Sequence, residues 1–97
     1  MDCDAVVDTG FNGSLALPSQ IVSALRLPKI GVMRAILGDG NEVTLDLHDA
    51  VVEWDGQERS VEAECVESDA LLGTALLTGH ELRISFIGQG TVEITRI

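Results

Sequence analysis

One carboxylate in this chain, that of Asp8, stands between an apolar pair and a threonine-glycine pair. Val6 and Val7 predict the end of a strand, and Asp8-Thr9-Gly10 predicts a tight turn directly after it. A threonine hydroxyl in such a turn can hydrogen-bond to neighbouring backbone, and a glycine lets the main chain approach where a side chain would clash. The pattern therefore predicts a carboxylate held in a fixed position at a strand end.

A fixed carboxylate of this kind can take part in amide hydrolysis. The reaction needs one ionised carboxylate to activate a water molecule and one protonated carboxyl group to polarise the carbonyl, and two such groups at close range share one proton. The motif occurs once in the 97 residues, so a catalytic pair requires two copies of the chain. The alternative is an ordinary turn after a strand, because Asp, Thr and Gly all favour turns.

The composition suits one small domain covering residues 1–97. Hydrophobic residues make up 45% of the chain but aromatic residues only 3%, so the core must be built from small aliphatic side chains that suit closely packed strands. The formal net charge of −10 disfavours binding to nucleic acid or to an anionic membrane. No apolar run approaches the roughly 20 residues that span a bilayer. The acidic start at 1–4 is unlike a secretory signal, so a cytoplasmic protein is expected.

The cysteines and histidines predict no metal or cofactor site. Cys3 and Cys65 lack the spacing of a zinc site, and His48 and His80 belong to no ligand-spaced cluster. Cys65 falls in an alternating run and is expected to pack as a small core residue. A disulfide between the two cysteines is the less favoured alternative, because the chain shows no export signal.

Short elements are expected to position the Asp8 turn. Apolar residues at helical spacing predict a short helix capped by Ser19 and stopped by Pro28, and a second short helix is expected at 74–77. Alternation and turn signals then predict strands at 33–37, 42–48, 50–54, 57–66, 82–87 and 91–97. These strands form one hairpin with a glycine-rich tip at 38–41 and another that turns at Asp55-Gly56.

Two kinds of side chain on the second hairpin are expected to have ordinary roles. Trp54 should pack across the hairpin strands. The acidic residues that alternate with apolar neighbours should lie on a solvated face: Glu53, Glu58, Glu62, Glu64 and Glu67. Neither feature predicts a site.

Read in order, three motifs resemble those of the single-domain, retroviral-type aspartic proteases, the retropepsin-like clan AA. Asp8-Thr9-Gly10 is similar to their catalytic loop, Gly38-Asp39-Gly40 to the tip of their flap hairpin, and Leu71-Leu72-Gly73 to the apolar pair and glycine that lead into a helix. Segments 11–18 and 71–82 also resemble the stand-alone bacterial-type members. The resemblance covers nearly the whole chain from residue 5 onward.

The resemblance implies an all-β fold, a small closed or partly open β-barrel of the retropepsin (acid protease) type with one or two short helices. It implies an aspartic endopeptidase that acts as a homodimer on a polypeptide substrate without a cofactor. Asp8 of each subunit would activate a shared water, Thr9 would join the two loops, and Gly10 and Asn12 would contact the substrate. The flap residues Gly38, Asp39 and Gly40 would close over the bound peptide.

Three features depart from the retroviral pattern. Residues 1–7 are all that precede the motif, where family members usually carry a further strand or hairpin. Phe11 stands where small residues are common, and Thr74 follows Gly73 where the retroviral enzymes carry a basic residue that ties the dimer together. The sequence therefore leaves a second hypothesis open, a non-catalytic binding or dimerisation module with a retropepsin-like fold.

Overall fold

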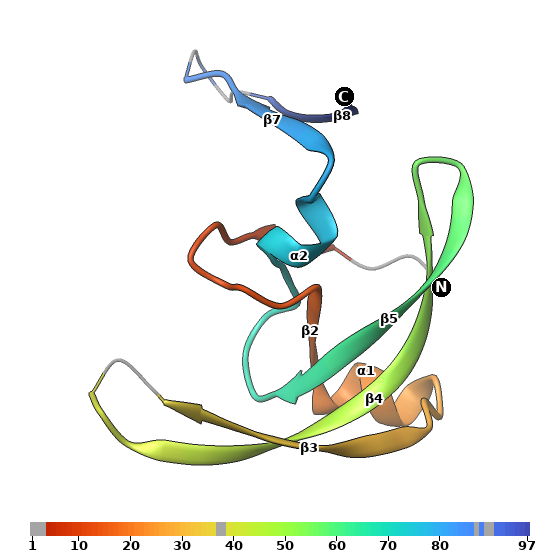
Figure 1. The fold of residues 1–97 in the computed structure, drawn as a ribbon, viewed down its shortest axis with the longest axis vertical. Coiled ribbons are helices and arrows are strands. Elements are labelled where there is room, and N and C mark those ends of the chain that lie inside the picture. Colours follow the sequence, from red (N-terminus) through yellow and green to blue (C-terminus); the bar gives the residue numbers. More distant parts are fainter. Residues whose placement is uncertain (1–3, 37–38, 87, 89–90) are drawn as a thin grey trace.

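Most of the chain is strand, arranged as one six-stranded sheet and one separate two-stranded hairpin (Figure 1). The computed structural model describes residues 4–36, 39–86, 88 and 91–97. The sheet has the order β1-β6-β2-β5-β4-β3, and the hairpin pairs β7 with β8. The bounds of the strands are β1 Val6–Val7, β2 Leu15–Pro18, β3 Lys29–Ile36, β4 Glu42–Trp54, β5 Gln57–Val66, β6 Leu71–Leu72, β7 His80–Ile84 and β8 Val92–Arg96.

The six-stranded sheet is open, so the closed form of the expected barrel is corrected. Its edge strands are β1 and β3, and no pairing among the described residues joins them. The two strands at the β1 edge are two residues long, whereas β4 and β5 are 13 and 10 residues long and leave the body of the molecule as long curved arms (Figure 1). Closure would require the edges to meet, which such unequal strands do not allow. The mostly-β class with two short helices is confirmed.

Strand pairing is mostly antiparallel, with two parallel exceptions. Strands β3, β4 and β5 form consecutive antiparallel pairs, whereas β1 runs parallel to β6 and β2 runs parallel to β5. The β4–β5 turn has positive φ at Asp55 (54°) and Gly56 (77°), the backbone that a two-residue primed turn requires. Strand β4 is continuous where two strands were expected, because Asp49 pairs with Glu62 instead of breaking the ladder.

The described part of the chain also contains two short helices, α1 at Ser19–Ala24 and α2 at Thr74–Leu77. The expected cap of the first helix is wrong. Pro18 holds the capping position with extended backbone and no side-chain hydrogen bond reaches the helix start, so Ser19 is already its first residue. The helix ends before Pro28 because Arg26 turns into the left-handed region at φ 53°.

The core lies on one side of the sheet, between the sheet and the two helices. It is formed by small and aliphatic side chains only: Leu15, Leu17, Val22, Ala50, Val61, Ala63, Ala70 and Leu76. Cys65 packs against this cluster, as its place in the alternating run predicted, and Cys3 lies outside the described residues. In the described part of the chain, no helix has the length and apolar character needed to cross a membrane.

Candidate active site

The predicted catalytic segment forms a loop of residues 8–14, the Asp8 loop, between β1 and β2. Strand β6 lies between these two strands, pairing parallel with β1 and antiparallel with β2. Val7 pairs with Leu72, and Leu72 pairs with Leu15 on the other side. The structure thus brings two of the three sequence motifs side by side, the Asp8 loop and Leu71-Leu72-Gly73.

Backbone groups fix the position of the Asp8 side chain. The amide of Asp8 donates to the carbonyl of Leu72 at 2.9 Å, and its carbonyl accepts from the amide of Phe11 at 3.1 Å. Its Oδ1 accepts a hydrogen bond from the amide of Gly10 at 2.9 Å. Oδ2 accepts no hydrogen bond from any described residue, so one carboxylate oxygen is oriented and the other is available to a partner.

Gly73 packs against the backbone of the Asp8 loop. A Cβ at this position would collide with the carbonyl oxygen of Gly13, and the amide of Gly73 donates to the carbonyl of Ser14 at 3.0 Å. Thr74 follows and donates to the carbonyl of Phe11 twice, from its amide at 2.8 Å and from Oγ1 at 3.3 Å. The glycine is required by this close approach, and Thr74 ties the start of α2 to the loop.

The large side chain of Phe11 fits because it lies over two glycines. Its ring carbons would come within 2.6 Å of a Cβ at Gly13 and 2.7 Å of a Cβ at Gly73. Either added methyl group would overlap the ring. The two unusual residues of this segment, Phe11 and Thr74, therefore both hold the loop to α2.

The sheet has a second face, opposite to the core. Directly paired residues share a face, and the face alternates along each strand. One such row crosses the sheet through Val6, Leu71, Ala16, Glu64 and Leu47. We call this face the loop side, because Gly13 and Ser14 of the Asp8 loop lie beside its residues Leu47 and Glu64.

The β3–β4 hairpin presents an apolar surface on the loop side. Its residues there are half-buried, whereas the side chains between them are exposed. The half-buried set is Met33, Ala35, Val43, Leu45 and Leu47. A cavity of about 360 Å³ separates this hairpin from the Asp8 loop, with Met33 and Leu47 on one side and Gly13 and Ser14 on the other.

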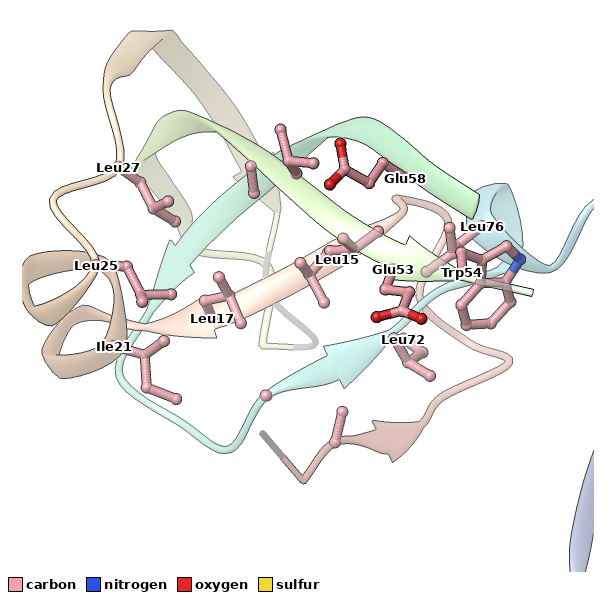
Figure 2. A pocket seen from close by; sticks show the side chains of 15 residues that line it. Leu15, Leu17, Ile21, Leu25, Leu27, Glu53, Trp54, Glu58, Leu72 and Leu76 are labelled. Carbon is pink, nitrogen blue, oxygen red and sulfur yellow. The ribbon is translucent and has the colours of Figure 1, made fainter. Parts of the chain in front are cut away.

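A larger cavity of about 610 Å³ lies on the core side of the sheet (Figure 2). Its wall is mostly aliphatic, with Leu25 and Leu27 at one end and Trp54 at the other, and it contains none of the predicted site residues. Size alone therefore does not mark the candidate site.

The remaining predicted residues lie in two exposed places. Thr9, Gly10 and Asn12 are exposed in the Asp8 loop, and Gly10 contacts the carboxylate of Asp8 through its amide. Asp39 and Gly40 are at the hairpin tip, and no hydrogen bond or ion pair within the described chain joins them to the Asp8 loop. Gly38 lies outside the described residues.

The tip is ordered by its own hydrogen bonds. The backbone amide and the side-chain amide of Asn41 donate to Asp39 at 2.9 and 2.8 Å, and these bonds, the backbone one first, hold the pKa of the Asp39 carboxyl below its usual value. The turn that the sequence predicted is thus closed by an aspartate and an asparagine.

Histidine and cysteine side chains gather nowhere in the described ranges. His48 Nδ1 lies 2.9 Å from the carbonyl of Leu27, and His80 accepts at Nε2 from Nε1 of Trp54 at 3.2 Å. No three His, Cys, Asp or Glu side chains in residues 4–36, 39–86, 88 and 91–97 are arranged to hold a metal ion. Trp54 packs edge-on against His80 of β7, with 5.5 Å between ring centres, and so connects the second hairpin to β7.

Glu64 is a residue near the site that sequence reasoning missed. It was expected to be solvated, but it is half-buried on the loop side, and burial, with a smaller contribution from the charge of Glu62, raises the pKa of its carboxyl. The only sequence signal was its alternation with core residues Ala63 and Cys65, which places it opposite the core but does not reveal what covers it.

The chain was compared with protein-family models, with curated proteins and with solved structures, and none of them matches.

Proposed function

We propose that this protein is an aspartic endopeptidase that acts as a homodimer, with Asp8 of each subunit holding one shared water. The observation that carries the proposal is the clamped Asp8 loop. Two motifs far apart in the sequence meet there, one carboxylate oxygen is fixed by the amide of Gly10, and the other has no partner within the described chain.

The chemistry uses the two carboxyl groups in complementary protonation states. The ionised Asp8 removes a proton from the water as the water oxygen attacks the peptide carbonyl carbon, and the protonated Asp8 of the second copy donates its proton to the carbonyl oxygen. The tetrahedral intermediate then breaks at the C–N bond. The Asp8 that took the water proton gives it to the nitrogen, and the other Asp8 takes a hydroxyl proton from the intermediate, which restores one ionised and one protonated carboxyl group. The loop backbone keeps both carboxylates oriented, so no side chain must reorganise during attack.

An extended polypeptide would bind between the Asp8 loop and the β3–β4 hairpin. The half-buried apolar residues of the hairpin face this space, and the hairpin edge can pair with a peptide backbone as a strand does. Closure of the tip at Asp39 and Gly40 over the peptide would exclude water from the reacting bond.

The β7–β8 hairpin supplies a surface for the second copy. Leu82, Ile84, Val92 and Ile94 share one face of it, and the outer pair, Ile84 and Val92, is 47% and 54% exposed. An isolated two-stranded hairpin is marginally stable in water, and an exposed apolar stripe marks an interaction surface. The same face of a second copy would cover this stripe.

The test is cleavage of an unfolded polypeptide at mildly acidic pH by the wild-type protein and by Asp8→Asn. The asparagine keeps the acceptor for the Gly10 amide, so the fold should persist while the rate falls by roughly 10²- to 10⁴-fold. Asp46→Asn is the matched control, because it removes the same charge from an exposed position whose partner is the surface residue Lys29. Equal cleavage by wild type and Asp8→Asn would end the proposal.

A mixing experiment separates catalysis by a dimer from catalysis by one chain. Excess Asp8→Asn protein added to a constant amount of wild type should lower the rate, because mixed dimers carry only one of the two carboxylates. A rate that does not change would contradict the shared site. A folded protein that binds peptide but never cleaves it would instead support the non-catalytic binding module.

A further inference from the structure

The cavity between the Asp8 loop and the β3–β4 hairpin has walls of two kinds. Met33 and Leu47 from the hairpin, Val61 from β5 and Ala75 from α2 make an apolar lining. Glu62, Glu64 and Arg59 of β5 make a charged one. An apolar passage that ends at charged groups fits a side chain with an aliphatic stem and a charged head.

The carboxylate of Glu64 lies against the Asp8 loop. A Cβ placed on Gly13 would lie 3.3 Å from Oε2 of Glu64, so the carboxylate rests against the loop backbone. No described residue forms a hydrogen bond or an ion pair with this carboxylate. A half-buried carboxylate without a partner is stabilised by any cation that reaches it.

The surrounding charges favour a cation as the occupant. Glu62 lies on the same face as Glu64, and Asp49 is directly paired with Glu62. The hydroxyl of Ser60 donates to Oδ1 of Asp49 at 2.8 Å. Because this donor is neutral, it does not neutralise the negative charge of Asp49. Arg59 is the one described cation in the lining, so negative charge predominates around the cavity.

We propose that this cavity is a specificity pocket for a lysine or arginine side chain of the polypeptide substrate, with Glu64 binding its charged head. The inference rests on the proposed endopeptidase function and names its substrate class. Met33 and Leu47 contact the aliphatic stem, and Glu62 adds attraction from the same face as Glu64. An acidic side chain at the same position meets like charge and is excluded.

The experiment measures binding without cleavage, using Asp8→Asn protein and fluorescently labelled extended peptides that differ at one position: lysine, norleucine or glutamate. Fluorescence anisotropy at low salt should show the lysine peptide bound about fivefold more tightly than the norleucine peptide, and the glutamate peptide more weakly than both. Adding Glu64→Gln should remove the preference for lysine. Adding Glu67→Gln instead, which removes an equal charge from an exposed residue outside the cavity, should leave it intact.

A second variant reverses the charge at residue 64 and should reverse the preference between the peptides. Glu64→Lys in the Asp8→Asn background should bind the glutamate peptide more tightly than the lysine peptide, a change that partial unfolding does not produce. The proposed pocket would be contradicted if the parent protein bound the lysine and norleucine peptides equally tightly. It would also be contradicted if Glu64→Gln and Glu67→Gln reduced the preference for the lysine peptide by the same factor.

Cleavage by the wild-type protein is measured separately, so the two proposals can fail independently. Cleavage without a preference for basic residues would retain the endopeptidase and discard the pocket. Lysine-selective binding without cleavage would retain the pocket and discard the endopeptidase.

Discussion

Gly73 lies so close to the carbonyl oxygen of Gly13 that no side chain fits between them. Gly73→Ala should therefore force the Asp8 loop away from α2 and lower the free energy of unfolding by about 3 kcal/mol, the upper range for overpacking. Urea denaturation followed by circular dichroism measures the change.

Gly31→Ala is the matched control for this substitution. Gly31 lies in β3, has no positive φ, and a methyl group added to it would meet no atom within 4 Å. The alanine should change stability by less than about 0.5 kcal/mol. If both substitutions lowered the free energy of unfolding equally, the close packing of Gly73 against the loop would not explain why a glycine stands there.

Gly10→Ala should separate activity from stability. Its Cβ would lie 3.3 Å from Oδ1 of Asp8, so the carboxylate must shift by a few tenths of an ångström. Because both residues are near the surface, the melting temperature should barely change, whereas a misplaced carboxylate should lower kcat about tenfold. Steady-state kinetics on a peptide that wild type cleaves provides the measurement, and an unchanged kcat would show that this orientation is not used.

Ile84→Lys should weaken self-association, because it places a charge in the apolar stripe of the β7–β8 hairpin. The dissociation constant of the dimer, measured by sedimentation equilibrium, should rise about tenfold or more, and activity per chain should fall on dilution. Thr95→Lys adds the same charge to the opposite face of the same hairpin and should leave the constant unchanged. Similar dissociation constants for both variants would assign the subunit contact to another surface.

Glu64 should make the protein less stable as the pH rises, whereas most carboxylates in folded proteins have the opposite effect. Burial raises its pKa, so the folded protein holds this proton more tightly than the unfolded chain does. The resulting stability is fully present below the pKa of an unfolded glutamate and is lost as the pH rises through the raised value. Glu64→Gln should thus be more stable than wild type at neutral pH, and this advantage should disappear in acid.

Urea unfolding of wild type, Glu64→Gln and Glu67→Gln across this range measures the effect. The Glu67 variant should keep the pH dependence of wild type, since Glu67 is exposed. If the stability of Glu64→Gln relative to wild type increased as the pH falls, the pKa of Glu64 would not be raised in the folded protein.

Local signals made the hairpins and α2 predictable. Asp55-Gly56 encodes the positive φ angles of its turn, and alternation encodes the faces of 42–48. The placement of β6 between β1 and β2 was not predictable, because strands of two residues carry no periodic signal and their pairing depends on backbone contacts with distant segments. For the same reason Trp54 packs on His80 of β7, where packing within its own hairpin was expected.

Within the candidate site, the sequence pointed to Asp8 and to Leu71-Leu72-Gly73 but not to Glu64. Glu64 belongs to an alternating segment of apolar and polar residues, which normally predicts one buried and one solvated face. Here the carboxylate of Glu64 lies against the backbone of the Asp8 loop at Gly13, a tertiary arrangement that alternation cannot encode.

Strand β4 extends without a break from the hairpin that faces the Asp8 loop to Trp54, which contacts His80. Next to it, Asp55 forms an ion pair of 2.8 Å with Arg96 of β8. One continuous β-ribbon is therefore shared by the region that would cover a peptide and the region that would contact a second subunit. A peptide bound at one end and a second copy bound at the other would thus contact the same strand.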